Sequence, residues 1–130
     1  MTKKGLDQDW LVQQAENLAW QLREAGWQEA EQGRTQASKA VEVAQDAESL
    51  RLFVNWLRYQ AARESRQQRF WSRQLKKQEL AEVLVSDLKA IQKRAASDQT
   101  PVMLAVRLYL GYFRRALVGV EYLARIRLEG

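Results

Sequence analysis

The stretch "LRLFVNWLRYQAARESRQQRFWSR", residues 50–73, combines a helical repeat with the place where a helix must end. Apolar residues recur every three or four positions in its first half, which is typical of the buried face of an amphipathic helix. They are Leu50, Val54, Leu57 and Ala61. No glycine occurs from Thr35 to Leu110, and one helix over that range would be about 110 Å long, too long for a compact domain. We therefore expect a turn inside "ESRQQ", where Ser65 and Gln68 have the spacing of a capping box, with Ser72 as second choice for the helix start.

The residues before this stretch predict two more helices. In "DQDWLVQQAENLAWQLREAG", residues 7–26, Asp7 or Asp9 can cap a helix that Gly26 can end. Its repeating apolar positions are Leu11, Ala15, Leu18, Leu22 and Ala25. Residues 27–47 offer mostly alanine on their repeating face and are broken at Gly33. We expect either a loosely packed alanine-rich helix or a helix preceded by a mobile segment.

Two further helices are predicted on the C-terminal side. The stretch "QLKKQELAEVLVSDLKAIQKRAA" has apolar residues at helical spacing, namely Leu80, Leu84, Leu88, Ile91 and Ala95. In "SDQTPVML", Thr100 as N-cap and Pro101 at the first helical position indicate a new helix. We expect this last helix to run to about Leu128.

The whole chain shows no pattern typical of β-strands. Apolar and polar residues do not alternate over any sustained stretch, and residues that favour helices dominate. A chain of 130 residues has the length of one domain, and it contains no internal repeat or low-complexity linker. The sequence therefore predicts an all-α fold: a compact bundle of four to five helices with a long apolar C-terminal helix, in a single domain over residues 1–130.

The composition excludes several kinds of chemistry. The chain has no cysteine, and so no disulfide, thiolate metal site or cysteine nucleophile; it also has no histidine, the commonest metal ligand and general base. No paired carboxylates or glycine-rich phosphate loop stand out. We expect a protein that is not an enzyme and uses no cofactor or metal. The N-terminus lacks the apolar run of a secretory signal, and arginines interrupt the most apolar region, so we expect no membrane partner and a cytoplasmic location.

The charge is divided unevenly along the chain, whose net charge is +5. Residues 1–50 hold five Lys or Arg against nine Asp or Glu, whereas residues 51–130 hold sixteen against seven. Within 51–77 there are eight basic residues and a single acid, Glu64. This asymmetry points to an anionic partner for the later part of the chain.

The basic residues of this region form a line if the helix continues unbroken to Arg73. On a helical wheel, Arg51, Arg58, Arg69 and Arg73 then fall within about 40° of one line, and Arg66 lies about 60° away. The ordinary interpretation is the solvated face of a bundle helix. Such a face usually interleaves acids, however, and arginine is suited to bidentate phosphate contacts. The candidate nucleic-acid-binding residues are Arg51, Arg58, Arg66, Arg69, Arg73, Lys76, Lys77, Arg114 and Arg115.

The aromatic residues of the region have simpler interpretations. Phe53 lies on the core side of the predicted helix and Trp56 near its edge. The pair Phe70 and Trp71 can stack on a base or plug one end of the bundle, and we favour the plug.

The last predicted helix is apolar over most of its circumference, so it is either the central helix of the bundle or covered by a neighbouring subunit. In "GYFRRALVG", Arg114 and Arg115 adjoin Tyr112 and Phe113, which makes either a second phosphate contact or a polar seam.

The segments "LRLFVNWLRYQAAR" and "YLGYFRRALVGVEYL", in a small basic chain without cysteine, resemble the small subunits of class 1 (multi-subunit) CRISPR effector complexes. The resemblance implies a non-catalytic helical bundle in a ribonucleoprotein complex that takes part in antiviral defence. Its basic face would hold the backbone of RNA or single-stranded DNA, as target or displaced strand. Its partners would be other subunits of the complex and copies of itself.

Two alternatives remain open from the sequence. The basic four-helix accessory protein of diversity-generating retroelements, which pairs with a reverse transcriptase and its RNA, has a similar build. A helical adaptor that binds only proteins is the hypothesis from a different class. Because no base-reading motif occurs, nucleic-acid binding would depend on backbone charge and shape.

Overall fold

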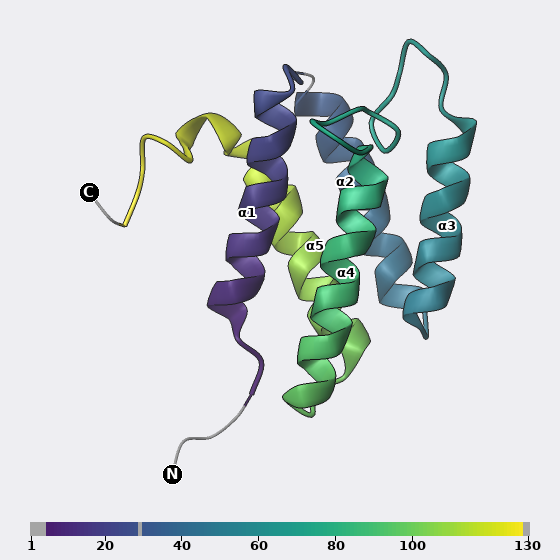
Figure 1. The fold of residues 1–130 in the computed structure, drawn as a ribbon, viewed down its shortest axis with the longest axis vertical. Coiled ribbons are helices and arrows are strands. Elements are labelled where there is room, and N and C mark those ends of the chain that lie inside the picture. The colour runs from purple at the N-terminus through teal and green to yellow at the C-terminus, as the bar shows by residue number, and fades with distance from the viewer. Residues whose placement is uncertain (1–4, 29, 129–130) are drawn as a thin grey trace.

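The computed structural model describes residues 5–28 and 30–128, and these residues form an all-α bundle with no β-strand (Figure 1). The helices are α1 (Gln8–Glu24), α2 (Ala30–Asp46), α3 (Leu50–Arg63), α4 (Leu80–Ser97) and α5 (Val102–Val118), followed by the short 3₁₀ helix η1 (Val120–Tyr122). Helix α5 packs mainly against α1 and α2 and also against α4, whereas α3 lies at the edge of the bundle beside α2 and α4. The prediction of an all-α bundle is confirmed.

Helix α1 begins and ends where the sequence indicates. The Asp7 side chain caps it, since its Oδ1 accepts a hydrogen bond of 3.1 Å from the backbone N–H of Trp10. Gly26 follows the helix with a φ of +88°, a conformation that glycine adopts without strain. Of the predicted core residues of this helix, four are fully buried and Ala25 is half-buried.

Helix α2 corrects the expectation that Gly33 breaks the segment. The helix runs through Gly33, and that glycine serves packing: a Cβ placed on it would lie only 2.3 Å from Cη2 of Trp27. Further along α2, Ala37, Ala40 and Ala44 are buried, and their small side chains let α2 pack closely against α5. The alanine-rich face is therefore a tight helix contact.

The connections on either side of α3 confirm one prediction and correct two. The turn expected within residues 64–68 is present, because α3 ends at Arg63. A break between α2 and α3 was not predicted; there Ser49 is the N-cap of α3, and its Oγ accepts a hydrogen bond from the backbone N–H of Leu52. The expected helix start at Ser65, and its alternative at Ser72, are wrong, because residues 64–79 form a loop and the next helix begins at Leu80. The capping box at the start of α4 joins Glu79 and Glu82 instead.

Helix α5 occupies the centre of the bundle, which was one of the two interpretations of its apolar surface. It begins at Val102 with Pro101 at the N-cap position, one residue later than predicted. The expectation that it runs to Leu128 is wrong: it ends at Val118, before Gly119, and the chain continues into η1 and turns. No helix in the described part of the chain is long and apolar enough to span a membrane.

An aromatic cluster closes the end of the bundle under the loop 64–79. Phe70 and Trp71 are fully buried, with ring centroids 4.7 Å apart, and they contact Trp27 and Trp56 respectively. The indole N–H of Trp71 also donates to the side chain of Gln36 on α2. The two residues plug the bundle, as favoured from the sequence, and their rings are not exposed for stacking on a base.

Candidate nucleic-acid interface

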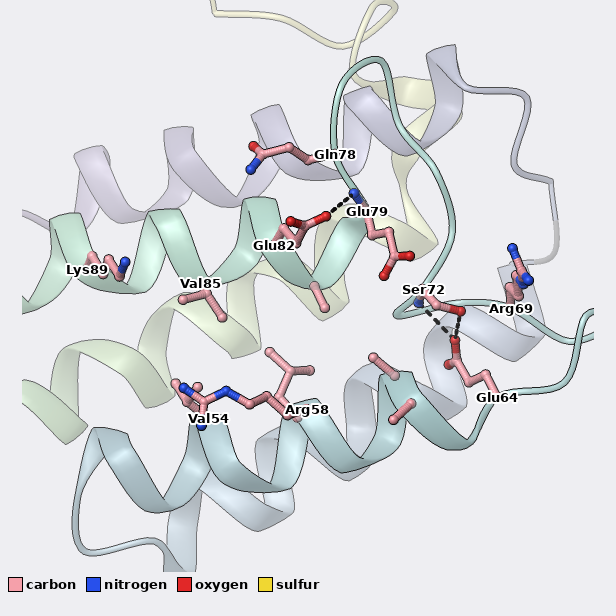
Figure 2. A pocket seen from close by; sticks show the side chains of 14 residues that line it. Val54, Arg58, Glu64, Arg69, Ser72, Gln78, Glu79, Glu82, Val85 and Lys89 are labelled. Atoms are coloured by element: carbon pink, nitrogen blue, oxygen red, sulfur yellow. Dashed lines mark hydrogen bonds between the residues drawn. The ribbon is translucent and has the colours of Figure 1, made fainter.

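Glu64, the single acid of residues 51–77, fastens the basic loop to the bundle. Its two carboxylate oxygens accept hydrogen bonds from three successive backbone N–H groups, those of Phe70 (3.1 Å), Trp71 (2.9 Å) and Ser72 (2.8 Å), and from the Ser72 hydroxyl at 2.7 Å. Figure 2 shows the contact between Glu64 and Ser72. Because these donors come from the backbone and a hydroxyl, the carboxylate orders the loop without pairing with any of its arginines.

A cleft of about 680 Å³ separates α3 from α4 beneath this loop (Figure 2). Arg58 on α3 and Lys89 on α4 line it from opposite sides, and Arg69 lines it from the loop. A second cleft of about 260 Å³ adjoins the first, since both are lined by Val54, Arg58, Val85 and Lys89. Arg51 lies in this second cleft, so the two clefts form one groove along α3.

The basic surface continues from α3 onto the loop 64–79. A third cleft of about 280 Å³ lies between the loop and the end of α1 and is lined by Arg66, Arg69 and Arg73, beside Ala25. Arg69 lines both this cleft and the groove between α3 and α4. We call the surface formed by Arg51, Arg58, Arg66, Arg69 and Arg73 the arginine path.

The structure thus brings together five of the predicted residues in a way that the sequence did not indicate. The unbroken helix that was to align them does not exist, because α3 ends at Arg63. Arg51 and Arg58 come from α3, and the other three come from the loop, which folds back over the end of the groove.

The cations of the arginine path have no protein partner within the described residues. None of the five side chains forms a hydrogen bond, ion pair or ring contact there, and the same holds for Lys89. Elsewhere arginines are engaged: Arg94 pairs with Asp7 at 3.0 Å and lies over the Trp10 ring. Arg107 donates to the backbone carbonyl of Ala44 at 2.7 Å, near the end of α2. Arginines that stabilise the fold therefore differ from those of the arginine path, which form no such contacts.

Three carboxylates line the groove, but two of the three have their hydrogen bonds directed to the backbone. Glu64 is held by the loop, as described, and Glu82 accepts from the backbone N–H of Glu79 at 3.0 Å. Figure 2 shows Glu79 and Glu82 together at the loop end of the groove, away from Lys89. These carboxylates keep their charge, so the three cations and three carboxylates that line the larger cleft balance formally. The adjoining second cleft, lined by Arg51, Arg58 and Lys89, has no carboxylate in its lining, so the positive end of the groove is there.

The remaining predicted residues lie apart from these clefts. Lys76 and Lys77 are exposed on the loop, and neither lines the three clefts. Arg114 and Arg115 are exposed near the end of α5, where Arg115 lies 5.9 Å from the centroid of the Tyr112 ring. They do not line the clefts of the arginine path either.

Lys89 is a groove residue that the sequence reasoning missed. It follows the buried Leu88 by one position, so the helical wheel of α4 places it at the boundary of the apolar face. That boundary position was a usable signal. What the sequence could not reveal is that this side of α4 faces α3.

A buried polar pair joins α4 to α5. The hydroxyl of Tyr109, which is fully buried, donates a hydrogen bond of 2.6 Å to Oδ2 of Asp87. Burial raises the pKa of Asp87 to about 6, against a smaller lowering by this hydrogen bond. Burial, together with the negative charge of Asp87, raises the pKa of Tyr109 well above its usual value, so the hydroxyl keeps its proton and remains the donor.

The described residues contain no group of three or more His, Cys, Asp or Glu side chains that could hold a metal ion. Neither a protein-family model, nor a curated protein, nor a solved structure matches the chain. The function is therefore inferred from the arginine path and its surroundings.

Proposed function

We propose that this protein is a non-catalytic nucleic-acid-binding protein that holds the sugar–phosphate backbone of single-stranded RNA or DNA along the arginine path. The proposal is carried by one observation: connected clefts link five arginines that form no ion pair with any described residue. They are Arg51, Arg58, Arg66, Arg69 and Arg73. Unpaired guanidinium groups in a row favour successive phosphates, because each can make a bidentate contact.

The shape of the path favours a single strand over a duplex. The path follows α3 and then bends over the loop toward the end of α1. A single strand follows such a bend at little cost, whereas a duplex resists bending over so short a distance. The described helices of the path also offer no element that is set to enter a groove of the duplex and read base edges.

The wider proposal is that the chain works as a small subunit of a cytoplasmic ribonucleoprotein complex, of the CRISPR effector kind that its sequence resembles. Exposed apolar side chains near the C-terminal end support contacts with other subunits or further copies. They are Val118, Tyr122, Ile126 and Leu128. Purification from native cells under mild conditions, followed by identification of bound RNA and proteins, tests this proposal.

A charge-matched pair of variants tests the binding surface. In the first, Arg58, Arg69 and Arg73 are replaced by glutamate; in the second, the exposed Arg34, Lys39 and Lys93, which lie off the path, are replaced in the same way. Both changes alter the net charge equally. We expect the first variant to lose about 100-fold or more in affinity for a labelled single strand at low salt, and the second to lose far less.

Equal losses in the two variants would show that overall charge, and not the path, binds the strand. No binding by the wild-type protein at low salt would contradict the proposal for the isolated chain and favour the helical adaptor that binds only proteins. Circular dichroism and urea unfolding of both variants separate a loss of binding from a loss of structure.

A further inference from the structure

The larger cleft between α3 and α4 has an apolar floor below a rim of charged side chains. The floor consists of Val54, Ala61, Ala81 and Val85, with the fully buried Leu57 beneath them. Around it lie three cations, Arg58, Arg69 and Lys89, and three carboxylates, of which Glu79 and Glu82 lie at the loop end, away from Lys89. A phosphate track alone needs only the rim. The cavity of about 680 Å³ beneath the rim falls within the size range of small-molecule sites.

The position of the cavity relative to the arginine path limits what can fill it. A strand whose phosphates contact Arg58 and Arg69 passes directly over the opening, because both residues line the cleft. The part of such a strand that gains from an apolar floor is the flat face of a base, which is otherwise exposed to water in an unpaired strand.

The loop end of the cavity provides hydrogen-bonding groups. Gln78 and Glu79 line it there, and Figure 2 shows both near the start of α4. Six of the fourteen lining residues are apolar and eight are polar or charged, so the cleft combines a surface for the face of a base with groups that match the donors and acceptors at its edge.

We infer that this cavity takes one nucleobase from the bound strand, with the adjoining phosphates held by Arg58, Arg69 and Lys89. The inference rests on the proposed function, and it adds a base-dependent component to binding that would otherwise depend on the backbone alone. The apolar floor accepts the face of any base because it is non-directional, and Gln78 and Glu79 are the groups that can discriminate among base edges.

A strand without bases measures how much the base contributes to the binding affinity. The affinity of the full chain is measured by fluorescence anisotropy for a labelled single strand and for a strand of the same length and charge in which abasic sites replace the bases. We expect the wild-type protein to bind the abasic strand at least about fivefold more weakly, because the apolar floor then has nothing to cover it.

Cavity-filling variants test whether the base binds in this cavity. Ala61→Phe and Val85→Phe fill the cavity from α3 and from α4, and each is expected to bind the two strands with nearly equal affinity. Ala96→Phe is the matched control, since Ala96 is exposed on α4 and does not line the cavity. It should keep the wild-type preference. Urea unfolding checks that each variant is folded.

The outcomes distinguish this inference from the proposed function. Equal binding of the two strands by the wild-type protein would overturn the base site and leave the arginine path intact. A base preference that survives in folded Ala61→Phe or Val85→Phe would also overturn it, because the base would then bind elsewhere. Failure to bind either strand would contradict both proposals. The wild-type comparison remains decisive even if a filling variant does not fold.

Discussion

At the scale of single residues, Glu64 shows how one carboxylate can order a loop whose other charges up to Lys77 are positive. It accepts hydrogen bonds from Phe70, Trp71 and Ser72, and two of these residues belong to the buried aromatic plug. Had it paired with an arginine nearby, the loop would have lost an anchor and that guanidinium group would be engaged in an ion pair. The position of the acid is thus as important to the basic surface as the arginines are.

Replacing Glu64 by glutamine tests this anchoring. The amide has one acceptor oxygen in place of two, and its NH₂ group would face backbone N–H donors, so we expect the free energy of unfolding to fall by about 1–3 kcal/mol. Urea denaturation measures it. Glu82→Gln, which alters the exposed capping box of α4, is the comparison and should cost less, about 0.5–1 kcal/mol. Equal small losses in both variants would show that the loop does not depend on Glu64.

Asp87 makes stability depend on pH. Its pKa rises from 3.8 to about 6 on folding, so the folded state holds a proton that the unfolded state has already released between these values. The stability that this proton provides is fully present below about pH 4 and is lost as the pH rises through 6. Relative to Asp87→Asn, the wild-type free energy of unfolding should fall by up to about 3 kcal/mol over that range.

Urea denaturation of both proteins at pH values from 4 to 7 measures the difference. Tyr109→Phe provides a second check, because it removes the hydrogen bond that lowers the pKa of Asp87 and should move the change to higher pH. If the difference between wild type and Asp87→Asn were constant across the range, Asp87 would not titrate as the structure indicates.

At the scale of elements, Gly33 and Gly111 offer opposite outcomes for the same substitution. Alanine favours a helix over glycine by about 1 kcal/mol. At Gly33 the new Cβ would lie 2.3 Å and 2.4 Å from two atoms of the buried, rigid Trp27 ring, so the clash should outweigh propensity and Gly33→Ala should destabilise by about 1–3 kcal/mol. At Gly111, within α5, a Cβ meets nothing within 4 Å, and Gly111→Ala should stabilise by about 0.5–1 kcal/mol. Thermal and urea unfolding would contradict this packing if both changes shifted stability in the same direction.

The sequence predicted those helices whose apolar residues repeat without interruption. The core positions of α4, such as Leu84 and Leu88, are buried as expected. The break at Ser49 was missed because the residues around it include neither glycine nor proline. The only sign of it in the sequence is the hydroxyl of Ser49, which caps α3. The end of α5 was placed too late, since apolar residues continue past Gly119 although the helix does not.

At the scale of the whole molecule, the candidate interface could be predicted only in part. The acid-poor arginine cluster is a property of composition, so its residues were found from the sequence. Its geometry depends on a loop that folds back between α1 and α4 and on the distance between α3 and α4. Neither property follows from helical periodicity, which describes one element at a time. Lys89 and the apolar cavity were therefore missed, although each of their residues has an ordinary place on its own helix.

The salt dependence of binding measures how many phosphates the whole surface holds. For a single strand, the slope of log K against log salt changes by about 0.7 for each phosphate contact. Replacing Arg58, Arg69 and Arg73 by alanine should therefore reduce the magnitude of the slope by about 2, if each side chain contacts one phosphate. The same replacement of Arg34, Lys39 and Lys93, which lie off the arginine path, should leave the slope nearly unchanged. Affinities between 50 and 200 mM salt provide both slopes. An equal reduction in the two variants would mean that the strand contacts the protein at many places, with no preferred track along α3 and the loop.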